Sequence, residues 1–240
     1  MQRVGTGMLR LLEHYTSTQG EGPSVGVMSQ FVRFAGCNLR CPLWPCDSQF
    51  AIEPKLFKDS YISVSPQELA SRIRRMEGAN GARNIVFTGG EPFLQPRANL
   101  RQTMTELDGE AFTFEAFTNG TLPFDLEMMD RGLQPVMDWK LSGSGEGKFS
   151  QVRVDNVEQM MQYGQGALKF TIAGRNDFEE ALTIWQKYVD GGPKLPVYVG
   201  PVWDKLPASQ LVEWIKLRRL PWILNVQVHN YVYGAHTRGT

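Results

Sequence analysis

The chain has 240 residues, of which 42% are hydrophobic, and its 25 Lys and Arg residues balance 25 Asp and Glu residues. This size and composition predict one α/β domain, residues 1–240, with a core of its own. A net charge of zero offers no basic field to nucleic acid or anionic lipid, so we expect a small-molecule substrate and neither of those partners. No signal-peptide pattern and no apolar run of about 18 residues occurs, so we expect a cytoplasmic protein without a membrane association.

Six apolar, β-branched segments, separated by helical ones, predict strands. They are Val25–Phe34, Asn84–Thr88, Ala111–Thr118, Pro135–Trp139, Ala167–Ile172 and Val197–Val202, with a further strand-like stretch at Asn225–Val228. Ser65-Pro66-Gln67-Glu68 is typical of a helix N-terminus with a capping box, and Asp155 and Asn176 predict two more helix starts. A last helix is expected from Pro207 to Arg219. Strands alternating with helices predict βα units joined into an open or closed barrel.

Chemically reactive or polar stretches follow four of the predicted strands. A cysteine-rich loop follows the first strand, Gly89-Gly90-Glu91-Pro92 the second, Asn119-Gly120 the third and Lys140-Leu141-Ser142 the fourth. Ligands of such folds bind at the C-terminal ends of the strands. We therefore expect these stretches to share one mouth of the barrel.

The three cysteines, Cys37, Cys41 and Cys46, fall within ten positions of one another. Three thiolates on one loop suit an iron–sulfur cluster or zinc, and the other alternative is three inert core cysteines. A zinc site needs a fourth ligand, and the three histidines are remote in sequence, although Asp47 is near. A cluster with three protein ligands leaves one iron to be chelated by an amino acid such as the methionine part of S-adenosylmethionine (SAM).

The cysteine loop together with Gly89-Gly90-Glu91-Pro92 resembles the radical SAM superfamily, whose usual cluster motif is Cys-x3-Cys-x2-Cys. Here Pro42 to Pro45 put four residues in the second gap, which changes the geometry of the loop more than the identity of its ligands. The resemblance implies a partial (β/α)6-type radical SAM barrel with mostly parallel strands, a [4Fe–4S] cluster on Cys37, Cys41 and Cys46, and SAM.

A longer set of motifs resembles the 7-carboxy-7-deazaguanine synthases over about residues 15–233. The motifs are Thr18-Gln19-Gly20-Glu21-Gly22, Phe31 to Cys37, Cys46-Asp47-Ser48, Thr88 to Pro92, Thr118 to Thr121, Asp138 to Ser142 and Gln227-Val228-His229. This resemblance implies conversion of 6-carboxy-5,6,7,8-tetrahydropterin to 7-carboxy-7-deazaguanine with loss of ammonia, in 7-deazapurine (queuosine) biosynthesis. SAM serves as a recycled radical initiator, and Mg²⁺ assists. No catalytic side chain is expected beyond the cluster and SAM.

The resemblance also assigns residues to the substrate. Gln19, Glu21 and Gly22 form a short loop whose carboxamide and carboxylate suit the amide and amino edge of a pterin, although the same loop could be a plain polar turn. Arg33 suits the substrate carboxylate, with a structural ion pair as the alternative. Thr88 and His229 are the remaining substrate contacts, and each could equally be structural.

The residues assigned to SAM and Mg²⁺ lie on the loops of the same mouth. Gly89 and Gly90 allow a close backbone approach to the methionine part, and Glu91 can accept from its ammonium group. The resemblance adds Asp47, Asn119, Lys140 and Ser142 for SAM and the hydroxyl of Ser48 for Mg²⁺. An ordinary loop role is the alternative for each of them.

Three further expectations concern segments and partners. Gly143–Phe149 lacks the residues of a phosphate-binding loop and is expected to be a flexible lid. Gly200-Pro201 stands where the family often has Gln-Pro, and Asn230 where Lys is commoner. Residues 221–240 are expected to complete the substrate site. The resemblance implies a homodimer and an electron donor such as flavodoxin or ferredoxin, with a glycyl-radical activating enzyme as the alternative function.

Overall fold

The computed structural model describes residues 7–43, 46, 48–54, 60–234 and 237. In this part of the chain the strands form one nine-stranded sheet, in the order β3-β1-β2-β4-β5-β6-β7-β8-β9. Their bounds are β1 Leu9–Thr18, β2 Met28–Phe34, β3 Ile62–Val64, β4 Asn84–Gly89, β5 Thr113–Thr118, β6 Leu133–Asp138, β7 Ala167–Ile172, β8 Val197–Pro201 and β9 Ile223–Leu224. Every pairing from β2 to β9 is parallel, whereas β1 pairs antiparallel with both β2 and β3.

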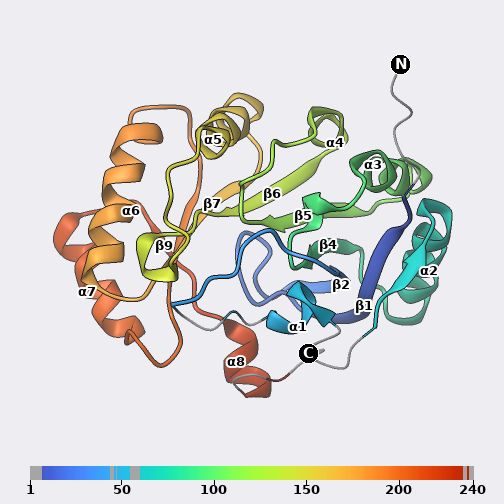
Figure 1. Cartoon of the computed structure of the whole chain (residues 1–240), viewed down its shortest axis with the longest axis horizontal. Coiled ribbons are helices and arrows are strands. Elements are labelled where there is room, and N and C mark those ends of the chain that lie inside the picture. The colour runs from blue at the N-terminus through green and yellow to red at the C-terminus, as the bar shows by residue number, and fades with distance from the viewer. Residues whose placement is uncertain (1–6, 44–45, 47, 55–59, 235–236, 238–240) are drawn as a thin grey trace.

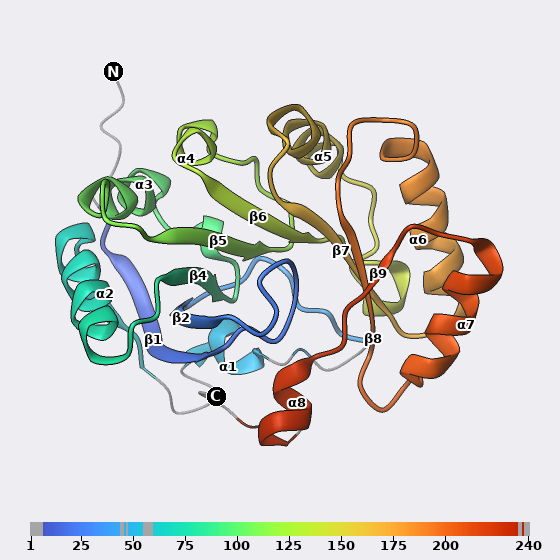
Figure 2. The same cartoon turned by 180° about the vertical axis from the view of Figure 1, so that it is seen from behind.

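Most of the helices cover the outer side of this curved sheet. The helices of the described residues are α1 Gln49–Ile52, α2 Pro66–Asn80, α3 Arg97–Glu106, α4 Leu126–Asp130, α5 Gln151–Tyr163, α6 Arg175–Tyr188, α7 Ala208–Arg218 and α8 Val228–Tyr233, with 3-10 turns η2 Pro92–Leu94 and η3 Ser142–Ser144. Figures 1 and 2 show α2 to α7 in an arc around the sheet, while α1 and α8 lie on its open side. Of the helices described, none is long and apolar enough to cross a membrane.

The predicted strand pattern is confirmed in its main features. The six predicted strands correspond to β2 and β4 to β8, which are consecutive and parallel in the sheet. Val25–Val27 lies outside β2, and β6 begins two residues earlier than predicted, at Leu133. These six strands and the helices between them form the expected partial (β/α)6-type barrel.

The first strand, β1, has no counterpart in the predictions. Leu9 and Leu11 are buried, but the remainder of the strand is mostly half-buried. Glu13 and Tyr15 pair in register with Arg33 and Phe31 of β2 and are not hydrophobic core residues. The apolar alternation that signals a half-buried strand therefore stops after Leu11.

One of the three predicted helix starts is confirmed, and the other two residues lie inside the helices that they were expected to begin. Ser65 caps α2 as predicted, since its Oγ accepts from the backbone NH of Glu68 at 3.1 Å. Asp155, however, lies inside α5, where it accepts from Gln151 Nε2 at 2.9 Å, and the helix begins after Ser150. The helix predicted from Asn176 begins one residue earlier, at Arg175.

The last strand-like stretch is also placed differently. The strand is Ile223–Leu224, and Asn225–Val228 runs from it into α8, so that His229 lies on a helix. The backbone NH of Val228 donates to the carbonyl of Gly20 at 3.1 Å instead of to a neighbouring strand. The end of the chain is thereby tied to the loop after β1.

The Ser65 cap generates a prediction about stability. Ser65→Ala removes the side-chain acceptor and should lower the free energy of unfolding by about 1 kcal/mol. Ser209→Ala on α7 is the matched control, because that helix has no side-chain cap hydrogen bond. Urea unfolding of both variants measures the difference, and equal stabilities would contradict the assigned cap.

Candidate active site

A cavity of about 460 Å³ opens at the C-terminal ends of β2, β4 and β5. Its volume suits a small organic ligand. The lining residues come from β1 and the turn after it, β2, the cysteine loop with α1, β4, β5, the loop after β8 and the C-terminal segment. They are Tyr15, Thr18, Gln19, Gly20, Glu21, Phe31, Arg33, Cys46, Ser48, Gln49, Phe50, Val86, Thr88, Phe117, Trp203, Gln227, His229, Asn230 and Thr237. Five of the six predicted substrate residues therefore line one cavity.

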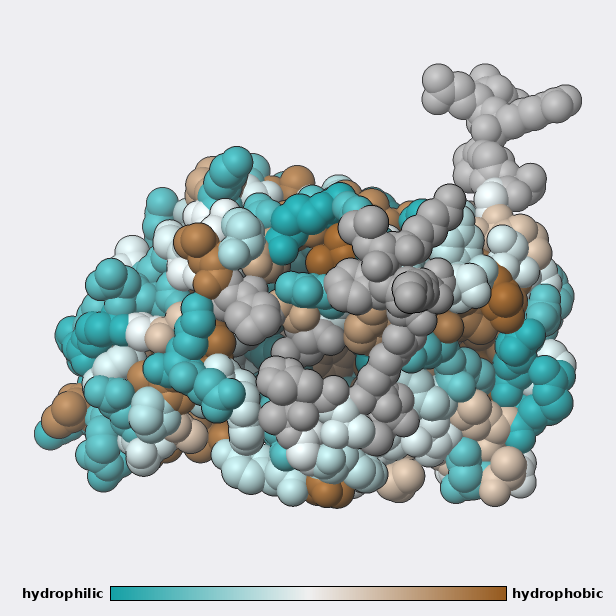
Figure 3. All heavy atoms as spheres, turned by 60° about the horizontal axis from the view of Figure 1, so that its bottom comes forward, coloured by the Kyte–Doolittle hydropathy of each residue, from teal (hydrophilic) through white to brown (hydrophobic). Residues whose placement is uncertain are grey.

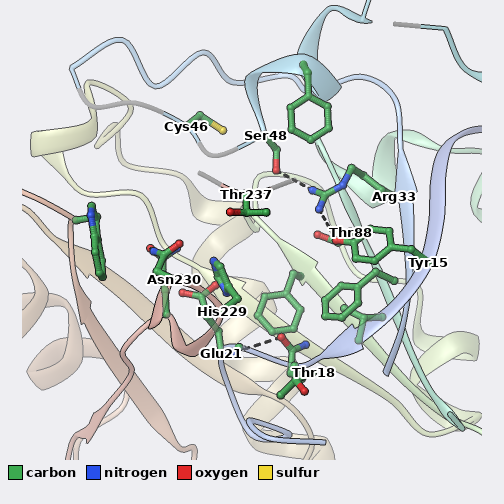
Figure 4. A pocket seen from close by; sticks show the side chains of 18 of the residues that line it. Tyr15, Thr18, Glu21, Arg33, Cys46, Ser48, Thr88, His229, Asn230 and Thr237 are labelled. Carbon is green, nitrogen blue, oxygen red and sulfur yellow. Dashed lines mark hydrogen bonds between the residues drawn. The ribbon is translucent and has the colours of Figure 1, made fainter. Parts of the chain in front are cut away.

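The cavity has two polar sides. In Figure 4, Arg33, Ser48 and Tyr15 lie together on one side, and Glu21 and His229 lie on the other. A cation and a carboxylate thus face the same space from opposite directions. A ligand with an anionic group at one end and hydrogen-bond donors at the other would match both.

Arg33 is held firmly in this wall. Its Nε lies 2.7 Å from Oε2 of Glu13, and its two terminal nitrogens donate to Ser48 Oγ at 2.9 Å and to the Tyr15 hydroxyl at 2.7 Å. The guanidinium also lies over the ring of Phe50, 5.3 Å from its centroid. The structural ion pair is present, and the fixed guanidinium still lines the cavity.

The predicted Mg²⁺ ligand does not fit a divalent cation in this arrangement. Ser48 Oγ accepts from the guanidinium of Arg33, so a Mg²⁺ ion on that oxygen would lie beside a fixed positive charge. Among the residues described, no group of three His, Cys, Asp or Glu side chains is placed to hold a metal ion. Mg²⁺ assistance therefore stays a prediction from the family resemblance.

The Gln19–Gly22 turn presents Glu21 to the cavity. Gln19 Nε2 donates to the buried Glu115 at 3.3 Å, and its Oε1 accepts from the backbone NH of Glu21 at 3.3 Å. Gln19 therefore stabilises the turn, which agrees with the alternative that this loop is a polar turn. Gly22, which is absent from the cavity lining, donates its NH to Asn225 Oδ1 at 2.8 Å.

His229 packs directly on this turn. A Cβ atom on Gly20 would collide with Nδ1 of His229, so only glycine permits the observed contact. The ring thus stands beside Glu21 at the cavity wall, as Figure 4 shows. Thr88, the remaining predicted substrate contact, pairs in register with Arg33 across β2 and β4.

Gly89 and Gly90 bring the end of β4 against the start of the cysteine loop. Two backbone hydrogen bonds join the two segments. Gly90 N donates to Phe34 O at 3.1 Å, and Glu91 N donates to Gly36 O at 2.8 Å. A Cβ on Gly90 would collide with the carbonyl of Gly36, and Gly89 has φ of +124°. Glycine is required at both positions by this close backbone approach.

The carboxylate of Glu91 is used inside the protein. It accepts from Phe93 N at 3.0 Å, Thr118 Oγ1 at 2.8 Å and Asn119 N at 2.8 Å, and the residue is fully buried. Burial raises the pKa of Glu91 despite these three donors. The side chain joins the ends of β4 and β5, and its predicted contact with the SAM ammonium stays a prediction.

The other residues predicted for SAM lie around the cysteine loop. Asn119 Nδ2 lies 3.9 Å from Cys37 Sγ, and Lys140 Nζ lies 2.8 Å from Asp138 Oδ2. Burial opposes the charge of Lys140, but the Asp138 carboxylate outweighs it and raises the pKa of the lysine. Ser142 donates its NH to Glu180, whereas Asp47 lies outside the described residues.

The expected flexible lid is packed against the cysteine loop. Leu43 N donates to Ser144 O at 3.3 Å, and Arg40 N donates to Glu146 Oε1 at 2.9 Å. Gly145 has φ of +81°, and a Cβ there would lie 2.8 Å from Cγ of Pro42. Pro42 and Leu43, the described part of the four-residue spacer, therefore pack on the turn after β6.

The three cysteines fit a cluster better than a single ion. All three are free thiols of intermediate exposure, and burial raises the pKa of Cys37 and raises that of Cys41 to about 11. Cys41 has a φ of +46°, a strained conformation for a residue with a side chain. Cluster ligands bind one iron each and need not converge on one point, whereas the ligands of zinc must.

Comparison with known proteins identifies the family. No protein-family model matches the chain. A 7-carboxy-7-deazaguanine synthase from Leptospira interrogans is 31% identical over 239 residues, which cover 92% of this chain and 94% of the relative. The synthase from Hyperthermus butylicus is 32% identical over 217 residues, with 86% and 83% covered. This chain belongs to the 7-carboxy-7-deazaguanine synthase family.

Further matches agree with this family. The 7-carboxy-7-deazaguanine synthase from Clostridium acetobutylicum is 27% identical over 232 residues and is covered to 98%. The crystal structure of QueE from Escherichia coli superposes with a TM-score of 0.67 at 22% identity, over 92% of this chain and 94% of that one. The structure of native anSMEcpe with bound AdoMet superposes with a TM-score of 0.55 at 12% identity, over 79% of this chain and 61% of that one. These two structures support the fold.

Family membership confirms the resemblance seen in the sequence, and a [4Fe–4S] cluster and SAM go with this family. The alternative of a glycyl-radical activating enzyme finds no support in these matches. Sequence reasoning missed several residues of the synthase cavity, among them Tyr15, Trp203 and Thr237. Glu13 and Tyr15 are two residues apart, so on a strand they point to the same face. That spacing could have indicated that both side chains lie beside Arg33.

Gly145 generates a prediction about the cysteine loop. Gly145→Ala forces a Cβ toward Pro42 and should lower the iron retained per chain after anaerobic reconstitution and a chelator wash. Gly81→Ala is the matched control, because Gly81 has a similar φ of +75° with nothing within 4 Å of an added Cβ. Both variants should lose about 1 kcal/mol of stability to backbone strain. Equal iron retention in the two would contradict the docking of the loop.

Proposed function

We propose that the protein converts 6-carboxy-5,6,7,8-tetrahydropterin to 7-carboxy-7-deazaguanine with release of ammonia, in 7-deazapurine biosynthesis. Its family supports this reaction, since relatives at 31% and 32% identity carry the name of the synthase. The observation in the structure that carries the proposal is the pairing of Arg33 and Glu21 on opposite sides of one cavity that also contains Cys46. These are the groups that a carboxylated pterin requires next to a cluster.

Arg33 and Glu21 would recognise the two ends of the substrate. The guanidinium of Arg33 suits the carboxylate, because charge-assisted hydrogen bonds to a planar cation are strong and directional. Glu21 suits the amide and amino edge, whose N–H groups need acceptors. Thr88 and His229 lie on the cavity wall within the same space and complete the proposed contacts, with the Gln19–Gly22 turn as their support.

The mouth beside the cavity would hold the cofactors. Cys37, Cys41 and Cys46 are the proposed cluster ligands, and the residues proposed for SAM are Asp47, Gly89, Gly90, Glu91, Asn119, Lys140 and Ser142. When bound, the cluster and SAM supply the adenosyl radical that starts the reaction. The chain itself orients the pterin, and its closely packed strand ends keep water from the reacting atoms.

The remaining parts of the proposal concern the chain as a whole. We propose one domain in which residues 221–240 complete the substrate site, supported by His229, Asn230 and Thr237 at the cavity. A homodimer, a cytoplasmic location and an electron donor such as flavodoxin or ferredoxin are proposed on the family resemblance. On the side shown in Figure 3, hydrophobic residues of the described part are scattered among hydrophilic ones.

The reaction predicts the behaviour of Glu21→Gln. The variant keeps the size of the side chain but loses the charge, so kcat/KM for the pterin should fall on the order of tenfold to a hundredfold, the effect of a lost charged hydrogen bond. Cleavage of SAM without pterin should persist. Anaerobic assays with a reductant measure both activities.

Two outcomes would contradict the proposal. The first is wild-type protein that contains four iron and four sulfide per chain, as a [4Fe–4S] cluster requires, and forms no deazaguanine product. The second is a Glu21→Gln variant with unchanged kcat/KM. Glu213→Gln on the exposed surface of α7 is the matched control and should behave as wild type.

A further inference from the structure

We propose that Lys169 and Asn225 are positioning residues for substrate recognition, which fix one carboxylate oxygen of Glu21 and so aim the other at the pterin edge. This inference rests on the proposed function. Neither residue belongs to the sequence motifs that pointed to the substrate. Lys169 lies on β7, and Asn225 lies between β9 and α8.

Both residues bind the same oxygen of Glu21. Lys169 Nζ lies 2.8 Å from Oε1, and Asn225 Nδ2 donates to that oxygen at 3.2 Å. A carboxylate held through one oxygen by two donors from different elements has a fixed plane, so Oε2 presents its lone pairs in one direction. That direction is set before a substrate arrives.

Lys169 suits this task because its own charge is buried and paired. Its side chain is 8% exposed, and its Nζ also lies 3.6 Å from Asp138 Oδ2, the oxygen that Lys140 binds at 2.8 Å. The four side chains form a row of alternating charge from Glu21 at the cavity to Lys140 near the cysteine loop. Separating Lys169 from Glu21 would leave an uncompensated buried charge, which is unfavourable. This cost keeps the lysine and the carboxylate together.

Asn225 fixes the turn as well as the carboxylate. Its Oδ1 accepts from the NH of Gly22 at 2.8 Å while its Nδ2 donates to Glu21, so one amide holds two successive residues. The residue is buried, and its own NH donates to Val199 O at 2.8 Å. A Cβ on Gly200 would collide with the carbonyl of Asn225, so glycine in β8 is what lets this segment approach.

The test is a double-mutant cycle on anaerobically reconstituted protein. Lys169→Met should raise KM for carboxytetrahydropterin on the order of tenfold, the effect of losing a charged hydrogen bond, with a much smaller change in kcat. In a Glu21→Gln background, the same change should alter KM less than about twofold, because the group it acts through is gone. Lys169→Arg should restore part of the loss.

Controls separate this role from a general loss of structure. Lys216→Met removes an exposed lysine that lies 2.8 Å from Glu213 and should leave KM unchanged. Iron content and SAM cleavage without pterin should match wild type in every variant. Asn225→Asp keeps the shape of the side chain and replaces the donor with a second carboxylate, so it should raise KM even if Lys169→Met fails to fold.

The outcomes distinguish the two proposals. Additive effects of Lys169→Met and Glu21→Gln, or an unchanged KM in both Lys169→Met and Asn225→Asp, would overturn the positioning role and leave the proposed reaction standing. Wild-type protein with an intact cluster that neither binds nor converts carboxytetrahydropterin would overturn the proposed function, and this inference with it. A non-additive rise in KM with unchanged SAM cleavage supports the positioning role.

Discussion

The close backbone approach between the ends of β2 and β4 determines where the chemistry of this protein takes place. Gly90 and Glu91 donate their NH groups to the carbonyls of Phe34 and Gly36, and no side chain could be accommodated at Gly89 or Gly90. Because the cysteine loop starts at the next residue, Cys37, this contact sets the loop against the end of β4. The carboxylate of Glu91 then fastens the end of β5 through Asn119. Three strand ends thereby share one mouth.

Paired charges fill the interior of the barrel beside this mouth. Arg33 is bound by Glu13, and Glu21 is bound by Lys169, which also lies near Asp138. A buried charge is costly unless it is paired and hydrogen-bonded. Each pair leaves a polar surface at the cavity wall, so the space suits a polar, carboxylated ligand. Two fixed and opposite charges also orient such a ligand, which positions it relative to the cluster loop.

The departures from the usual family pattern are compensated by contacts elsewhere in the fold. The described part of the longer cysteine spacer, Pro42 and Leu43, rests on the turn after β6, where Leu43 N donates to Ser144 O, and Lys205 Nζ donates to Leu43 O at 2.8 Å. In β8, the absence of a side chain at Gly200 admits the segment that brings Asn225 to Glu21. Both contacts support the site from positions outside the lining of the cavity.

The strand segments, the helix cap at Ser65 and the three clustered cysteines were predictable from the sequence, because each depends on residues that are neighbours in the chain. The sequence also indicated Glu21 and Arg33, whose motifs are local. The place of β1, the contact of Tyr15 with Arg33, and the contacts of Lys169 and Asn225 with Glu21 became visible only in the folded protein. Asn225 is 204 residues from Glu21 in the chain, and Lys169 belongs to a different strand. No local pattern signals such partners, since the packing of distant elements brings them together.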